Sequence, residues 1–137
     1  MIRKIGRIML IVVVLLFGFG LIADNWAQDV PNPLKTAKSG KFGTYLVDSK
    51  GMTLYIFDKD KEAGKSTCYK GCAKAWPLFA PEADDPSPMA PLSIITRDDG
   101  AKQYSYKGKP LYYYRKDTKA SVIKGDGKGK VWWVAKP

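Results

Sequence analysis

The chain has 137 residues, of which 23 are lysine or arginine and 13 are acidic, so it is strongly basic at neutral pH. It has no histidine and only two cysteines. These absences exclude Ser-His-Asp and Cys-His nucleophile pairs, histidine-ligated zinc and c-type haem, whose CxxCH signature needs a histidine. We therefore expect a protein that is not an enzyme, with no catalytic residue, no metal site and no cofactor.

The first predicted element is an export signal. Three basic residues precede an uncharged apolar run over residues 8–23, the layout of a secretory signal peptide. The run is shorter than the about 20 residues that a membrane-spanning helix needs. We predict a signal peptide over residues 1–27, then an N-terminal linker over residues 28–40, and a periplasmic or secreted protein. An uncleaved membrane anchor stays the alternative, because Asn25 would occupy a cleavage-site position that favours small residues.

The remaining sequence contains a repeat. The stretch GMTLYIFDKD at residues 51–60 returns as GKPLYYYRKD at residues 108–117, an offset of 57 positions. A register that persists through loops of different composition indicates a true repeat. The same offset aligns four pairs of residues: Tyr55 with Tyr112, Phe57 with Tyr114, Asp60 with Asp117, and Trp76 with Trp133.

Each copy predicts a β-hairpin that continues into a further strand. The turns SKG and KGK contain the glycine that tight hairpin turns require, and the strands MTLYIF and PLYYY are apolar on both faces. Strands of this kind are usually central and buried, so we expect their tyrosines in the core. A single hairpin is marginally stable in water, and the second copy supplies the surface that the first needs.

We therefore predict an all-β fold, a small sandwich or partly closed barrel built from two hairpin-plus-strand repeats, with one short helix around residues 69–75. The β domain covers residues 41–137. It divides into repeat 1 (residues 41–80), a proline-rich connector (residues 81–92) and repeat 2 (residues 93–137).

Two further features have expected places in this fold. Asp60 and Asp117 follow the last aromatic residue of their strands by three positions, where an aspartate side chain can hold the departing backbone, so we expect them to be structural. Trp76 and Trp133 are expected to close the core. Because neighbouring strand residues face opposite ways, Trp132 is expected to be exposed.

These motifs resemble those of secreted repeat proteins described as predicted lipoproteins with a conserved Yx(FWY)xxD motif. The stretches STCYKGCAKAWPLF and GKGKVWWVA also look like the family's, and the likeness covers residues 41–135. The two motif copies consist of Tyr55, Phe57 and Asp60, and of Tyr112, Tyr114 and Asp117. The resemblance implies an exported two-repeat β domain and transfers no catalytic residue. No cysteine lies near the end of the apolar run, so attachment by a lipid is not expected.

Cys68 and Cys72 are the only thiols. In an exported protein such a pair oxidises, and a separation of four residues allows a bridge. We predict a structural disulfide. The alternative is a periplasmic redox or copper-handling protein that uses the pair, with Met52 or Met89 as a further copper ligand.

The second repeat carries the excess charge. Residues 97–137 hold 11 basic and 4 acidic residues, against 9 and 8 in residues 28–96. The leading hypothesis is a non-catalytic envelope protein, a binding or structural module for an anionic polymer, lipid headgroups or an acidic protein rather than nucleic acid. The alternative is that lysines merely keep a β-rich surface soluble. The candidate partner-binding residues are Lys107, Lys109, Lys124, Lys128, Lys130 and Trp132.

Overall fold

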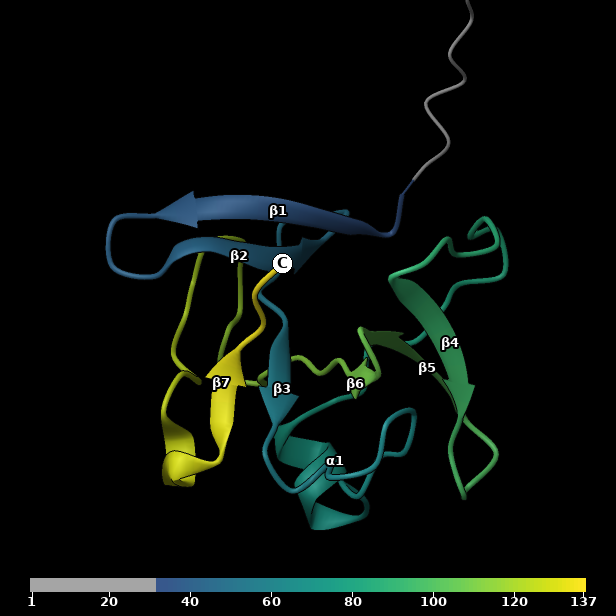
Figure 1. Ribbon diagram of the computed structural model, residues 1–137. Coiled ribbons are helices and arrows are strands. Elements are labelled where there is room, and N and C mark those ends of the chain that lie inside the picture. Colours follow the sequence, from purple (N-terminus) through teal and green to yellow (C-terminus); the bar gives the residue numbers. More distant parts are fainter. Residues whose placement is uncertain (1–31) are drawn as a thin grey trace, which may run out of the picture.

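A computed structural model describes residues 32–137 (Figure 1). The expected signal peptide, residues 1–27, lies outside the described residues. The elements are β1 (Leu34–Ser39), β2 (Gly43–Asp48), β3 (Tyr55–Phe57), α1 (Gly71–Ala75), β4 (Leu92–Thr96), β5 (Lys102–Tyr106), β6 (Lys109–Pro110), the 3-10 helix η1 (Lys128–Lys130) and β7 (Trp132–Val134).

The strands form three small antiparallel sheets, β1–β2, β3–β7 and β4–β5–β6. Within residues 32–137 the sheets do not close into a barrel. The all-β prediction is confirmed, and so is the single short α-helix, since α1 lies inside the segment expected to be helical.

Strand β1 lies within the segment that we expected to be a linker. It pairs with β2 over its whole length, from Leu34 opposite Asp48 to Ser39 opposite Gly43. The sequence LKTAKS has little apolar alternation to mark it as a strand. Backbone pairing with β2 stabilises it instead, so the folded domain begins at about Leu34.

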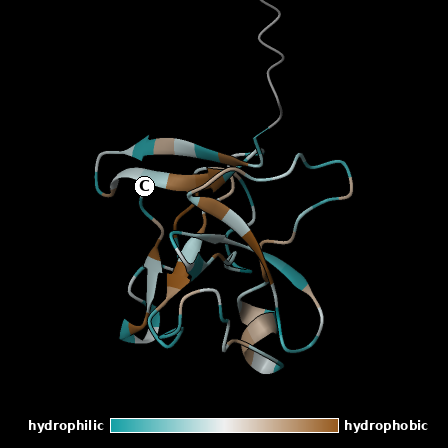
Figure 2. Cartoon of the chain, turned by 45° about the vertical axis from the view of Figure 1, so that its right-hand side comes forward, coloured by the Kyte–Doolittle hydropathy of each residue, from teal (hydrophilic) through white to brown (hydrophobic). Residues whose placement is uncertain are grey.

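The core lies on both faces of the strand that carries the first motif. Tyr55 and Phe57 belong to one hydrophobic cluster, whereas Leu54 and Ile56 contribute to a second. This arrangement follows from side-chain alternation along a strand that is apolar on both faces. Figure 2 shows the most hydrophobic segments on the strands, while the turns and loops are largely hydrophilic.

The two repeats exchange their last strands. Strand β7, at the end of repeat 2, pairs with β3 of repeat 1, so teal and yellow segments lie side by side in Figure 1. In return, the end of repeat 1 pairs with repeat 2, where Leu78 bridges Tyr112 and the Tyr113 N–H donates to the Pro77 carbonyl at 2.7 Å. Each repeat therefore lacks a strand that only the other repeat supplies.

Candidate functional site

The two motif tyrosines meet at the centre of the molecule. Tyr55 and Tyr112 exchange both backbone hydrogen bonds, with N···O distances of 2.8 and 3.0 Å. Their hydroxyls then cross over: Tyr55 Oη donates to Asp117 Oδ2, and Tyr112 Oη donates to Asp60 Oδ2 at 2.7 Å. All four side chains are buried. The tyrosine of each motif thus binds the aspartate of the other motif.

Each aspartate also holds the loop that follows its own strand. Asp60 Oδ1 accepts from the backbone N–H and the hydroxyl of Thr67, both at 2.7 Å. Asp117 Oδ1 accepts from the Lys124 N–H at 2.9 Å. In both repeats the bonded N–H lies seven residues after the aspartate. The motif aspartates therefore hold a loop and join the two repeats, and only the first of these roles was predicted from the sequence.

Burial controls the ionisation of these pairs. It raises the pKa of the Tyr55 phenol well above its ordinary value, and the hydrogen bond to Asp117 raises this pKa further. Burial also raises the pKa of Tyr112, and its bond to Asp60 acts in the same direction. Burial raises the pKa of the Asp117 carboxyl, although the bonds from Tyr55 and Lys124 oppose the rise. The phenols therefore stay neutral donors at physiological pH.

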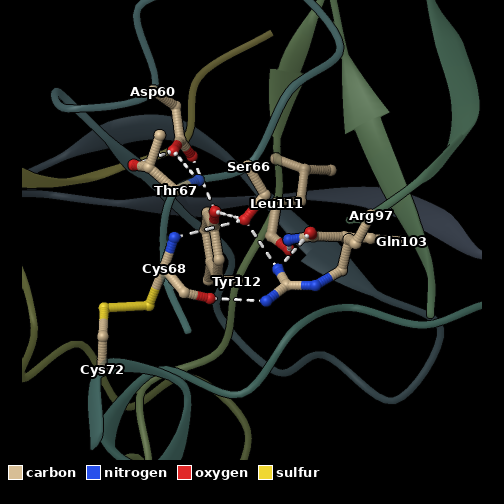
Figure 3. The surroundings of a disulfide bond; sticks show 9 residues. All are labelled: Asp60, Ser66, Thr67, Cys68, Cys72, Arg97, Gln103, Leu111 and Tyr112. Carbon is tan, nitrogen blue, oxygen red and sulfur yellow. Dashed lines mark hydrogen bonds between the residues drawn. A yellow bond between two sulfur atoms is a disulfide. The ribbon is translucent and has the colours of Figure 1, made fainter. Parts of the chain in front are cut away.

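A chain of hydrogen bonds connects one of these pairs to a buried arginine (Figure 3). Arg97, whose exposed fraction is 4%, donates from Nη1 to Ser66 Oγ at 2.6 Å. Ser66 Oγ lies 2.6 Å from Tyr112 Oη. Because Tyr112 uses its single proton for Asp60, the serine is the donor in this contact. Two hydroxyls thus link a buried guanidinium to a buried carboxylate.

The remaining contacts of Arg97 fix neighbouring backbone. Nη1 also donates to Gln103 Oε1 at 2.8 Å, and Nη2 donates to the Cys68 carbonyl at 2.5 Å. Nε lies 3.5 Å from Asp99 Oδ1 without forming a hydrogen bond. Sequence reasoning missed Arg97, Gln103 and Ser66. An arginine before the turn sequence DDG resembles an ordinary surface charge, and no local pattern marks it for burial.

The predicted disulfide is confirmed. Cys68 and Cys72 are bonded with a sulfur–sulfur distance of 2.03 Å, and Cys68 is fully buried. Figure 3 shows the bond next to the Arg97 network, whose contact with the Cys68 carbonyl joins the two. Both sulfurs are occupied by each other in this form, so the pair offers no thiolate to a metal.

The expected roles of the two adjacent tryptophans were wrong. Trp132 is buried, with an exposed fraction of 5%, and stacks on Trp76 with ring centroids 3.9 Å apart. Trp133 is the exposed one, at 38%. Phe57 and Tyr114 extend the stack at its two ends, with centroid distances of 4.0 and 4.3 Å.

A shift of one residue explains this error. Tyr55 pairs with Val134 and Tyr112 with Leu78, so the last strands of the repeats correspond at an offset of 56, not 57. The loop after the motif is one residue shorter in repeat 2. In a strand such a shift moves every side chain to the opposite face. Trp132, not Trp133, is therefore the structural counterpart of Trp76.

The five candidate lysines are exposed and lie in two separate segments of the chain. Lys107 and Lys109 belong to the β5–β6 turn, where the Gly108 carbonyl accepts from the Gly64 N–H at 2.8 Å. The other three, Lys124, Lys128 and Lys130, lie in the loop before β7 and in η1.

The family model of a secreted repeat of unknown function matches residues 36–80 and 93–136. The chain belongs to this family. Both matched segments are repeats as expected, and the secreted family confirms the exported localisation. No curated protein and no solved structure matches the chain. Over residues 32–137, no helix has the length and apolarity needed to cross a membrane.

Proposed function

We propose that this secreted repeat protein is a non-catalytic binding module of the cell envelope whose partner is an anionic polymer. One observation carries the proposal. Of the 11 basic side chains in residues 97–137, all except Arg97 are exposed, whereas three of the 4 acidic ones are exposed. The exposed surface of repeat 2 thus carries a large positive excess, which attracts anions.

In this proposal the buried motif residues have a structural role, and exposed residues bind the partner. Tyr55, Tyr112, Asp60 and Asp117 bind one another, and their burial leaves no route for a large partner. Binding to a polymer needs groups at the surface, where loops can adapt without disturbing the sheets. The lysines of the β5–β6 turn and of the loop before β7 meet that condition.

Charge-based binding must weaken as salt rises. Exposed charges separated by more than about 8 Å interact weakly at physiological ionic strength, since mobile ions screen them. We therefore expect strong retention on an anionic polymer at low salt and little at high salt.

The test replaces the five lysines Lys107, Lys109, Lys124, Lys128 and Lys130 with glutamine. A matched control replaces five exposed lysines that precede repeat 2, namely Lys35, Lys38, Lys50, Lys61 and Lys74, so that both variants lose the same charge. Retention of the mature protein is measured on immobilised alginate, a polyuronate, and on phosphatidylglycerol vesicles at low and high salt. We expect the repeat 2 variant to lose retention and the control to keep most of it. Equal retention of all three proteins at low salt would overturn the proposal.

A further inference from the structure

One exposed aromatic residue has no counterpart in the other half of the molecule. Trp133 pairs with Ile56, whereas Tyr113, the counterpart of Ile56, donates its N–H to Pro77. Trp133 in one half therefore corresponds to Pro77 in the other. The shared core of the repeats does not explain an indole with a 38% exposed fraction at this position.

The Trp133 ring is held in a fixed orientation. Its Nε1 donates to Asp58 Oδ2 at 2.7 Å, and a Cβ atom built on Gly127 would lie 3.9 Å from Cζ3 of the ring. Gly127 directly precedes η1, so the indole lies between that helix and the turn after β3. The residue that corresponds to Asp58 in the other half is Arg115, which cannot accept such a bond.

Three exposed lysines are chain neighbours of the residues that approach this ring. Lys59 follows Asp58, and Lys128 and Lys130 form the ends of η1, all three exposed. The ion pairs that the structure shows within residues 32–137 are Lys65–Glu62 and Arg97–Asp99, so neither uses a lysine beside Trp133. The nearby Asp126 is exposed but already accepts from the Val134 N–H at 2.9 Å.

We propose that Trp133, Asp58, Lys128 and Lys130 form a subsite for one acidic sugar unit of a polysaccharide. This inference rests on the proposed function and specifies its ligand. The flat indole packs against the C–H face of the sugar ring, since aromatic rings provide large apolar area at low entropy cost. The lysines bind the carboxylate or sulfate group, and Asp58 accepts from a sugar hydroxyl.

The geometry favours a sugar over a lipid headgroup. The Asp58 carboxylate beside the ring can accept from a sugar hydroxyl, whereas a phospholipid phosphate offers it only acceptor oxygens. The indole N–H, which anchors interfacial tryptophans through its polar end, is already bonded to Asp58.

The experiment measures the affinity of the mature protein for alginate oligosaccharides by titration calorimetry. Trp133→Ala should weaken binding by about tenfold or more, the loss of one good contact. Trp133→Phe should retain most of the affinity because it keeps a flat ring. The matched control is Ile94→Ala, which removes another large hydrophobic side chain of similar exposure, 39%, on β4 and should leave the affinity unchanged. Binding to phosphatidylglycerol vesicles should be the same for wild type and Trp133→Ala.

The outcomes separate this subsite from the broader proposal. If the five-lysine variant loses retention on alginate while Trp133→Ala binds like wild type, the subsite is refuted and the charge-based function stands. A loss of vesicle binding in Trp133→Ala with unchanged alginate affinity would also refute it, in favour of a lipid. If wild type binds neither alginate nor vesicles at low salt, both proposals fail. Equal melting temperatures of the variants, expected for a surface side chain, ensure that folding is not what changes.

Discussion

The two halves of the molecule share their interior and differ at their surface. The interior shows the same contacts twice, since each tyrosine binds the opposite aspartate and Trp76 stacks on its counterpart Trp132. The surface is not repeated. Repeat 1 alone has the disulfide, and repeat 2 alone has the exposed tryptophan and most of the excess charge. The repeated motif thus specifies how the halves join, whereas the proposed binding function uses residues that were not duplicated.

The largest expected effect separates the two adjacent tryptophans. Trp132→Ala removes a ring from the centre of the stack and should lower the free energy of unfolding by about 3–5 kcal/mol. Trp76→Ala should cost a similar amount because it occupies the corresponding place. Trp133→Ala should change stability by about 0.5 kcal/mol or less. Urea denaturation midpoints measure all three, and a larger loss for Trp133 than for Trp132 would contradict the assigned register.

Alkaline pH should weaken both crossed tyrosine–aspartate pairs. Burial raises the pKa of Tyr55 and Tyr112 above the ordinary value of 10.0, so the folded state retains protons that the unfolded state releases. The stability that these phenols contribute is complete below pH 10 and is lost as pH rises above it. The loss is about 1.4 kcal/mol per pH unit for each tyrosine.

Denaturation between pH 9 and pH 11.5 tests this expectation. Tyr55→Phe and Tyr112→Phe should each reduce the slope of the free energy of unfolding against pH by about 1.4 kcal/mol per pH unit. Tyrosinate absorbance that develops near pH 10 from these two residues in the folded protein would count against their buried pairing.

The two motif aspartates should differ modestly. Asp60 accepts three hydrogen bonds and Asp117 accepts two. We expect Asp60→Ala to cost about 3 kcal/mol and Asp117→Ala about 2 kcal/mol, since each leaves buried donors without a partner. A double-mutant cycle of Asp60→Ala with Tyr112→Phe isolates the bond between the halves. Additive losses in that cycle would show that the crossed pair contributes no coupling.

An effect of about the same size as that of Asp117→Ala is expected for the disulfide, which only repeat 1 has. The cysteines are four positions apart, so the bond closes a short loop and restricts the unfolded chain little. Replacing both cysteines with alanine should lower stability by about 2 kcal/mol, and the protein should remain folded. Far-UV circular dichroism and a thermal scan of this variant, beside wild type treated with a reductant, measure the effect. Complete unfolding would mean that the bond organises the Arg97 network as well as its own loop.

Much of the fold was visible in the sequence because the signals are local. Apolar runs and turn glycines predicted the hairpins, the constant offset predicted the repeat, and the spacing of Cys68 and Cys72 in an exported chain predicted the bridge. The family match confirms the secreted repeat, and the structure confirms the all-β class. Each of these properties depends on short local patterns, on their recurrence along the chain, or on composition.

The tertiary structure decided which segments pair and which side chains they bury. Strand exchange, the crossed tyrosine–aspartate bonds and the burial of Arg97 all join residues from opposite halves of the chain. Periodicity within a strand says that neighbouring residues face opposite ways, but not which face meets the core. A loop shortened by one residue reversed the faces of Trp132 and Trp133, because register is set by the partner strand and not by the sequence of the strand itself.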